Sequence, residues 1–213
     1  KHTESFTNAP NSPVSLAPRP PSAASTPLPE GPVGRYQLEE VLGRGGFGMV
    51  WRATDPELHR AVAVKILRSD RAAGPAAQQA LLAEARKIAK LNHPAILKVY
   101  DVLREGDGVY VVSEWMPRGA LAGHMSEFRG RWQEIASLVV SIAEALHYAH
   151  LHGVVHRDIK PHNILLDEHG LPRLADFGLA VTEDEQLSES RGTLGTFAYM
   201  SPEAPRGDSQ YAD

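Results

Sequence analysis

The sequence predicts an α+β fold, in which a five-stranded antiparallel sheet with one main helix precedes a helical region. Short apolar runs bounded by Gly and Asp-Pro fill much of residues 33–116, and their alternation is typical of antiparallel strands. One amphipathic stretch interrupts these runs, and a long helical periodicity follows in residues 117–213. With 213 residues, 42% of them hydrophobic, the chain can form two small lobes that share an interface, preceded by a tail.

The expected tail is residues 1–32. This stretch holds eight of the sixteen prolines and eight Ser or Thr residues, with Phe6 as its only aromatic residue. Such a composition buries too little apolar surface to offset the entropy of ordering, so we expect a disordered tail or linker. A proline-rich ligand for a recognition domain is the alternative. Because the chain starts at Lys1, we do not expect this end to be a native start.

Five strands and one helix are expected before residue 117. The helix covers residues 72–92, which are rich in Ala, Leu, Glu and Lys and repeat apolar side chains every three or four positions. It ends before His93-Pro94, because proline cannot continue a helix. The turn sequence Glu-Gly-Asp-Gly at 105–108 predicts a hairpin between the last two strands. The expected strands are residues 36–43, 48–54, 60–67, 96–103 and 109–115.

A long buried helix is expected in the second region. Its apolar face consists of Ile135, Leu138, Val139, Ile142, Leu146 and Ala149, which recur at helical spacing. The architecture therefore changes from sheet to helix after Pro117 and Gly119. The sequence shows no internal repeat.

Composition excludes several classes of function. The 22 Lys and Arg against 26 Asp and Glu give a formal net charge of −4, which provides no long-range attraction to nucleic acid or to an anionic membrane. Without cysteine, the chain has no disulfide, thiolate metal site or cysteine nucleophile, which suits a reducing, cytoplasmic location. No apolar run approaches the roughly 18 to 20 residues that span a bilayer, so no membrane segment is expected in this chain.

Glycines cluster at 43–50, Gly-Arg-Gly-Gly-Phe-Gly-Met-Val, between two expected strands, where they let backbone amides approach a polyphosphate closely. A flexible hairpin is the alternative. The glycines do not open a helix and no Gly-Lys-Ser/Thr follows, so the dinucleotide and nucleoside-triphosphatase loops are excluded. Lys65 then lies within an apolar strand, either extending to water or held by Glu84 of the expected helix so that it can grip phosphate oxygens.

The most specific motif is His-Arg-Asp-Ile-Lys-Pro-His-Asn at 156–163, followed by Asp-Phe-Gly at 176–178. Phosphoryl transfer from ATP requires positive charge around the phosphates, two hard oxygen ligands for a metal ion and one carboxylate beside the nucleophile. These segments and Lys65 supply each group, whereas the alternative interpretation is ordinary loop and turn residues. Together with the glycine loop, Glu84 and Ser-Pro-Glu at 201–203, they make the chain resemble the protein kinase family from about residue 35 onward.

The resemblance implies a two-lobed protein-kinase-like fold that uses ATP and Mg²⁺. By resemblance, Asp158 accepts or orients the proton of the substrate hydroxyl, and Lys160 neutralises charge on the phosphoryl group in transfer. Asn163 and Asp176 are expected to hold magnesium between the phosphates. Thr196 is expected to support Asp158 and Lys160.

The resemblance also implies a nucleotide site. Residues 114–116 form the connection whose backbone bonds adenine, and Ser113 controls access to a rear pocket. Val50, Ala63 and Leu165 enclose the ring, although each is also an ordinary core residue. The full set expected to bind ATP is Leu42, Gly43, Gly45, Gly48, Val50, Ala63, Lys65, Glu84, Glu114, Met116 and Leu165.

The motifs are similar to those of the serine/threonine branch and of bacterial eukaryotic-like, Hanks-type kinases. Lys160 and Gly195-Thr196 carry the first similarity, and the sequence at 147–156 carries the second. The implied function is ATP-dependent phosphorylation of serine or threonine hydroxyls on protein substrates. The alternatives are a truncated or pseudokinase-like nucleotide-binding scaffold without turnover, and a small-molecule kinase of the same two-lobed fold.

Regulation by phosphorylation is also implied. In related kinases an arginine at the position of Arg157 pairs with a phosphorylated activation segment, and a phosphate adds roughly −1.5 to −2 charge. The acceptors expected here are Ser188, Ser190 and Thr193. The alternative is that these are solvated residues in a loop.

The chain is expected to be incomplete at its C-terminal end. A complete kinase domain continues through several more helices beyond Asp213, and a later arginine pairs with the position of Glu203. Without these parts, a carboxylate loses its partner and the helix at 135–149 loses apolar cover. We therefore expect a piece of a longer active kinase that is poorly stable alone.

Overall fold

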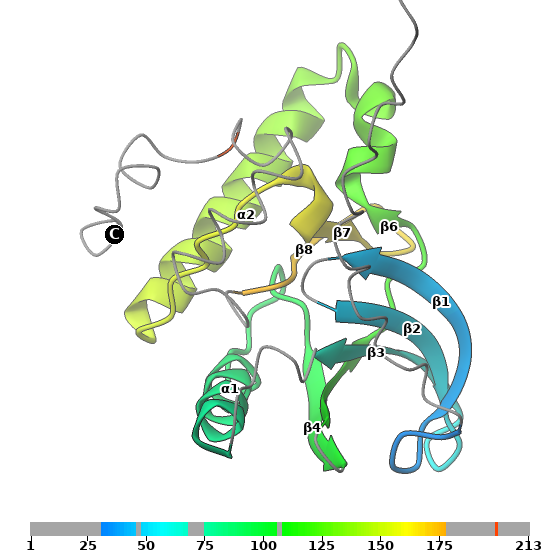
Figure 1. The fold of residues 1–213 in the computed structure, drawn as a ribbon. Coiled ribbons are helices and arrows are strands. Elements are labelled where there is room, and N and C mark those ends of the chain that lie inside the picture. The colour runs from blue at the N-terminus through cyan, green and yellow to red at the C-terminus, as the bar shows by residue number, and fades with distance from the viewer. Residues whose placement is uncertain (1–30, 46–47, 68–74, 106–107, 178–198, 200–213) are drawn as a thin grey trace, which may run out of the picture.

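The computed structural model describes residues 31–45, 48–67, 75–105, 108–177 and 199. In Figure 1 a five-stranded sheet and helix α1 occupy the lower part of the view, and helix α2 with a small second sheet occupies the upper part. The expected two-lobed α+β architecture is therefore confirmed. The expected tail lies outside the described residues except for its last two positions, 31 and 32.

The first sheet contains the five expected strands, all antiparallel, in the order β1-β2-β3-β5-β4. The strands are β1 (Gln37–Gly45), β2 (Gly48–Asp55), β3 (Arg60–Leu67), β4 (Val99–Glu105) and β5 (Gly108–Glu114). Alternation along β3 gives the sheet two faces. Val62 and Val64 are fully buried in an outer cluster with Val33 and Tyr36, so Ala63 and Lys65 face the opposite side.

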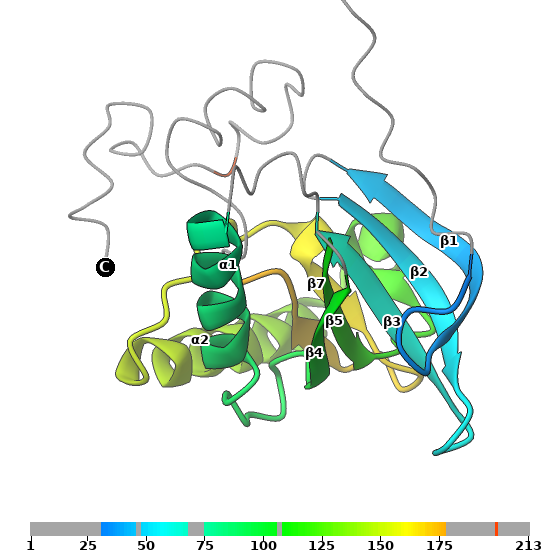
Figure 2. The ribbon, with the colours of Figure 1, turned by 60° about the horizontal axis from the view of Figure 1, so that its bottom comes forward.

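Helix α1 (Pro75–Ile88) is shorter than the expected range of 72–92. Pro75 suits the first turn, where its missing N–H has no helical partner in any case. Beyond Ile88 the chain turns, and the Leu91 N–H donates to the Ile88 carbonyl oxygen at 2.9 Å. Ala85 and Ile88 are buried, and Figure 2 shows α1 beside β4.

The fourth strand begins three residues later than the expected start at 96. Ile96 instead forms a parallel bridge with Leu174, and the Leu97 N–H donates to the Leu174 carbonyl oxygen at 2.9 Å. The backbone of residues 96 and 97 thus pairs with a segment that is distant in the sequence. Local periodicity cannot reveal such a pairing. Residues 96 and 97 therefore join the first sheet to the second half of the chain.

The second half contains the expected long helix, α2 (Trp132–Leu151), together with elements that the sequence did not predict. These are β6 (Gly119–Ala120), the 3-10 helices η2 (Leu121–Phe128) and η3 (Pro161–Asn163), β7 (Ile164–Leu166) and β8 (Pro172–Leu174). Strands β6, β7 and β8 form a small antiparallel sheet in that order. None of the helices in the described ranges has the length and apolar character that crossing a bilayer requires.

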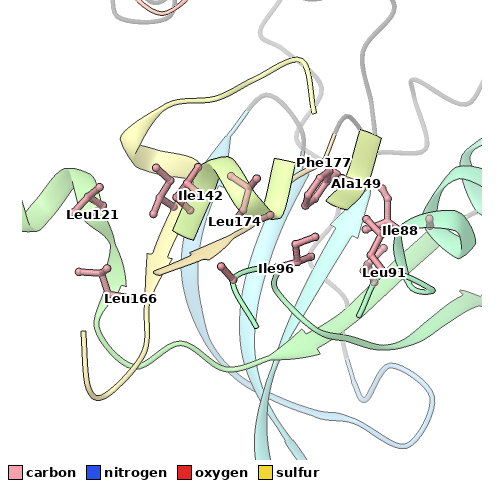
Figure 3. Packing of buried hydrophobic residues seen from close by; sticks show 14 of the residues in the cluster. Ile88, Leu91, Ile96, Leu121, Ile142, Ala149, Leu166, Leu174 and Phe177 are labelled. Carbon is pink, nitrogen blue, oxygen red and sulfur yellow. The ribbon is translucent and has the colours of Figure 1, made fainter. Parts of the chain in front are cut away.

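One apolar core joins both halves. Ile88, Leu91 and Ile96 from the first half pack in the same cluster as Leu174 and Phe177 from the second. Figure 3 shows Phe177 close to Ile88 and Leu91. Ile142, Ala145 and Ala149 provide the buried face of α2 in this cluster, whereas Val139 is 57% exposed. This shared core fixes the position of the second half against the first sheet.

Candidate active site

A cavity of about 540 Å³ lies between the two sheets. Its walls come from β1, β2 and β3, from the connection after β5, and from β7 and the residues after β8. Expected site residues in its lining are Leu42, Gly43, Val50, Ala63, Lys65, Ser113, Glu114, Trp115, Met116, Leu165 and Asp176. The three residues expected to enclose an aromatic ring therefore share one cavity.

Lys65 and Asp176 meet inside this cavity. The Lys65 ammonium nitrogen lies 2.7 Å from Asp176 Oδ1, although the residues lie on β3 and beyond β8. Burial raises the pKa of the Asp176 carboxyl, but the charge of Lys65 and its hydrogen bond outweigh burial, so the pKa falls below its ordinary value. Asp176 is therefore ionised at neutral pH, and the Lys65 ammonium offsets its charge.

His156 connects the motif at 156–163 to the segment before Asp176. Its ring is 1% exposed, and Nε2 donates to the Ala175 carbonyl oxygen at 2.8 Å. The Asp158 N–H donates to Nδ1 at 3.2 Å. One nitrogen thus donates while the other accepts, which is the pattern of a neutral imidazole. Burial also favours the neutral form, because desolvation lowers the pKa of His156.

Asn163 closes the loop from its other end. Its side-chain amide donates both to the Asp158 carbonyl oxygen and to Asp158 Oδ2, each at 2.8 Å. Asp158 Oδ2 also lies 2.7 Å from the ammonium nitrogen of Lys160, and the Ala175 N–H donates to the Asn163 carbonyl oxygen at 2.8 Å. The loop and the Asp176 segment are therefore fastened together through both backbone groups of Ala175.

Two of the three non-glycine residues with a positive φ in the described part of the chain lie in or next to this loop. Arg157 and Asp176 have φ values of 65° and 60°, in the left-handed region that side chains rarely adopt. Such conformations persist where the surrounding structure holds them in place. Here the hydrogen bonds of His156 and Asn163, described above, supply that restraint. The fold thus holds both residues in uncommon conformations beside the cavity.

Glu84 departs from the expectation. It is exposed on α1, and the ion pair described for Lys65 is with Asp176. Glu84 was expected to hold Lys65, but Ala85 and Ile88 occupy the buried side of α1 and Glu84 lies outside it. In this arrangement a carboxylate opposite Lys65 comes from the second half of the chain.

The glycine loop divides into two parts. Gly43 lines the cavity, whereas Gly45 and Gly48 pair with each other where β1 and β2 meet. Gly48 has a φ of 124°, and a Cβ there would collide with the carbonyl oxygen of Ile66. Only glycine fits this close approach of the second and third strands. Residues 46 and 47 lie outside the described residues.

Several cavity residues were not predicted as site residues from the sequence. Leu97, Val99, Val111, His162 and Leu174 line the cavity as well. Val111 and Leu97 each carried only a strand signal, and the actual place of Leu97 depends on its contact with Leu174. Other expected site residues lie outside the described ranges: Thr196, the acceptors Ser188, Ser190 and Thr193, and the segment 201–203.

The site offers oxygen ligands for a metal ion. The Asn163 amide nitrogen is committed to Asp158, which leaves its amide oxygen as the group for a cation. The Asp176 side chain is 39% exposed beside Lys65, so its carboxylate can also face the cavity. The described residues hold no group of three His, Cys, Asp or Glu able to enclose a metal ion. Both groups are oxygen ligands of the kind that Mg²⁺ takes in proteins, and its remaining ligands would come from phosphate and water.

The sequence has relatives among known proteins. The protein kinase domain family matches residues 36–213. A probable serine/threonine-protein kinase of Streptomyces coelicolor is 39% identical over 183 residues, covering 82% of this chain and 27% of the relative. The serine/threonine-protein kinase PknB of Mycobacterium leprae is 37% identical over 183 residues, covering 82% of this chain and 29% of the relative. The chain thus spans less than a third of the length of these two relatives.

A solved structure agrees with these relatives. The crystal structure of the PknI kinase domain of Mycobacterium tuberculosis has a TM-score of 0.60 and 29% identity, and the match covers 70% of this chain and 61% of that one. The family match includes the glycine loop, Lys65 and the two motifs that meet at the cavity. Since it also spans most of the sequence, this chain belongs to the protein kinase family.

Proposed function

We propose that this chain catalyses ATP-dependent phosphorylation of serine or threonine hydroxyls on protein substrates, with Mg²⁺ as the divalent ion. One observation carries the proposal: Lys65 on β3, the motif at 156–163 and Asp176 after β8 are separated in the sequence, yet they come together. Lys65 meets Asp176 in the cavity, while Asp158, Asn163 and Ala175 are bonded together beside it. This arrangement supplies the positive charge, carboxylate and metal ligands that phosphoryl transfer requires.

Each residue has a defined task in this proposal. Lys65 binds oxygens of the nonreacting phosphates, and Asp158 orients the substrate hydroxyl and receives its proton. Lys160, already 2.7 Å from Asp158, offsets negative charge on the phosphoryl group in transfer. Asn163 and Asp176 would hold Mg²⁺, which neutralises phosphate charge when it is bound.

The proposal extends to the type of substrate and to the cellular location. The relatives named above are serine/threonine-protein kinases by name, which supports a protein hydroxyl over a small-molecule acceptor. We also infer a cytoplasmic location for this domain, because ATP is the phosphoryl donor.

A phosphoryl-transfer assay tests the proposal. Radiolabelled ATP is supplied with a generic protein acceptor, and parallel reactions replace the protein by an aminoglycoside or by choline. Asp158→Asn should lower kcat about a hundredfold to ten-thousandfold, because the carboxylate beside the hydroxyl is lost. Asp176→Asn should raise the Mg²⁺ concentration needed for half-maximal rate. Asp167→Asn, a matched change outside the cavity lining, should leave the rate unchanged.

The same assay separates the alternatives. Nucleotide binding without transfer in the unmodified chain would identify a binding scaffold and contradict the proposal. Transfer to the small molecules alone would assign a different substrate class.

A further inference from the structure

A second group of charged side chains lies next to the central cavity, at the connection after β5. Glu114 is the last residue of β5 and lines the cavity. Its Oε1 accepts the Lys98 N–H at 2.8 Å and lies 3.6 Å from Arg173 Nε. Its own N–H donates to the Lys98 carbonyl oxygen at 2.9 Å. Glu114 is therefore held through both its backbone and its side chain.

Arg173 is the group on which this arrangement depends. It lies on β8, directly opposite Leu165 of β7, which lines the cavity. Its guanidinium donates to the Pro94 carbonyl oxygen, and another of its nitrogens lies 3.6 Å from Asp167 Oδ2. One side chain thus joins the small sheet, the segment before β4 and the end of β5.

Partial burial strengthens these ion pairs. The side chains of Arg173, Glu114 and Asp167 are 23%, 22% and 17% exposed, so solvent screens their charges less than it screens a surface ion pair. A pocket of about 350 Å³ lined by Lys98, Glu114 and Arg173 lies beside the pair. Glu114 therefore borders open space on this side as well as at the central cavity.

We infer that Arg173 is a positioning residue for the nucleotide site. Its ion pair with Glu114 fixes the angle at which the connection after β5 passes the cavity. This inference rests on the proposed function and on the expectation, implied by the kinase resemblance, that the backbone of residues 114–116 bonds the adenine ring. A rotation of the first sheet about this connection separates Glu114 from Arg173, because the two residues belong to different sheets. The pair therefore favours one cavity shape before ATP binds. Less conformational entropy is then lost when ATP binds.

The test measures nucleotide affinity and turnover separately. A fluorescent ATP analogue is titrated into the full chain, and KM for ATP and kcat are measured on a protein acceptor. Arg173→Gln should weaken nucleotide binding and raise KM about fivefold, which corresponds to about 1 kcal/mol. The kcat should change less than about twofold, since Arg173 touches no reacting group. Arg173→Lys, which keeps the charge, should recover part of the affinity.

Further variants distinguish positioning from a general effect on β8. Asp167→Asn removes the other carboxylate that faces Arg173. The new amide oxygen can still accept the N–H groups of residues 169 and 171. We expect this variant to leave nucleotide affinity unchanged. Glu114→Gln is also made alone and together with Arg173→Gln. The double variant should bind the nucleotide no more weakly than the weaker-binding of the two single variants, because both changes break the same interaction.

The outcomes are distinct. If the unmodified chain does not bind the analogue, the proposed function fails. If it binds and Arg173→Gln binds equally well, the proposed function stands and this inference is wrong. Equal losses in Asp167→Asn and Arg173→Gln, or additive losses in the double variant, would also overturn it.

Discussion

At the scale of single residues, His156 shows how one side chain can organise a site without taking part in chemistry. It donates to Ala175 and accepts from Asp158, and its ring lies 4.7 Å from the ring of Phe177, centroid to centroid. Burial keeps it neutral, with a pKa below the ordinary value. A charged imidazole would have to donate from both nitrogens, and the Asp158 N–H would then lose its acceptor.

Replacing His156 should therefore destabilise the fold. In His156→Leu, the Ala175 carbonyl and the Asp158 N–H lose their partners inside the protein, which should cost about 2 to 4 kcal/mol of unfolding free energy. Urea unfolding followed by circular dichroism measures this loss. His169→Leu is the control, because the His169 side chain is 74% exposed. Equal stability of the two variants would contradict the structural role of His156.

Ser113 is a second residue whose size matters. It is 7% exposed and lines the central cavity, and it pairs across the sheet with Ala63. Two small side chains thus face each other at one edge of the cavity. We expect Ser113→Met to weaken inhibitors that carry a bulky group for the rear pocket by about tenfold or more, by occupying their space. Inhibition curves for paired inhibitors with and without the bulky group measure the change, and equal weakening of both would contradict it.

At the scale of elements, η2 carries a charge cluster at the edge of the cavity. His124 Nδ1 lies 2.6 Å from Glu127 Oε1, and Nε2 lies 2.7 Å from the Arg118 carbonyl oxygen. Both partners are acceptors, so both ring nitrogens must donate and the ring is protonated. The hydrogen bonds to Glu127 and then to Arg118 raise the pKa of His124 above 6.5. The hydrogen bond to His124 lowers the pKa of Glu127 below 4.5.

These pKa shifts define a pH window for the element. Because the pKa of His124 is raised in the folded state, its stabilising effect is complete below pH 6.5 and is lost as the pH rises through the folded value. The pKa of Glu127 is lowered, so its effect is lost as the pH falls through a value below 4.5. The difference in unfolding free energy between the natural chain and His124→Gln should therefore shrink as the pH rises above 6.5. A pH-independent difference would contradict this.

The small sheet of β6, β7 and β8 illustrates what an element needs from its surroundings. Strands of two or three residues are too short for an alternation to be recognised. Leu174 nevertheless bonds through its backbone to Ala95 and Leu97, in a segment far away in the sequence. These bonds fix β8 and with it the position of Asp176, two residues later.

At the scale of the whole molecule, the two halves share one apolar core and should unfold together. Phe177, 2% exposed, packs in the cluster that includes residues of α1 and α2. Phe177→Ala should lower the unfolding free energy by about 3 to 5 kcal/mol. In a Trp132→Phe background, which removes the exposed tryptophan of α2, the fluorescence of Trp51 and Trp115 reports on the first half. It should show the same midpoint as circular dichroism, to which α2 contributes. Separate midpoints in this background would show that the halves unfold independently.

The sequence by itself determined the large elements and the chemistry. Alternation was sufficient for the five strands, helical spacing was sufficient for α2, and the motifs at 156–163 and 176–178 identified residues that the fold brings together. These features are local, since periodicity and motif spacing depend only on neighbouring residues. Glu84 marks the limit, because helical spacing predicted an apolar side of α1, where Ala85 and Ile88 are buried, but not that the neighbouring Glu84 would be exposed.

Only the tertiary structure decided which groups meet. The pairing of Lys65 with Asp176, the small sheet and the contacts of Arg173 all join segments that are far apart in the chain. Such contacts depend on how the apolar core sets one half against the other, and no stretch of sequence contains that information on its own. The core therefore decides the geometry of the site, while the sequence motifs supply its chemical groups.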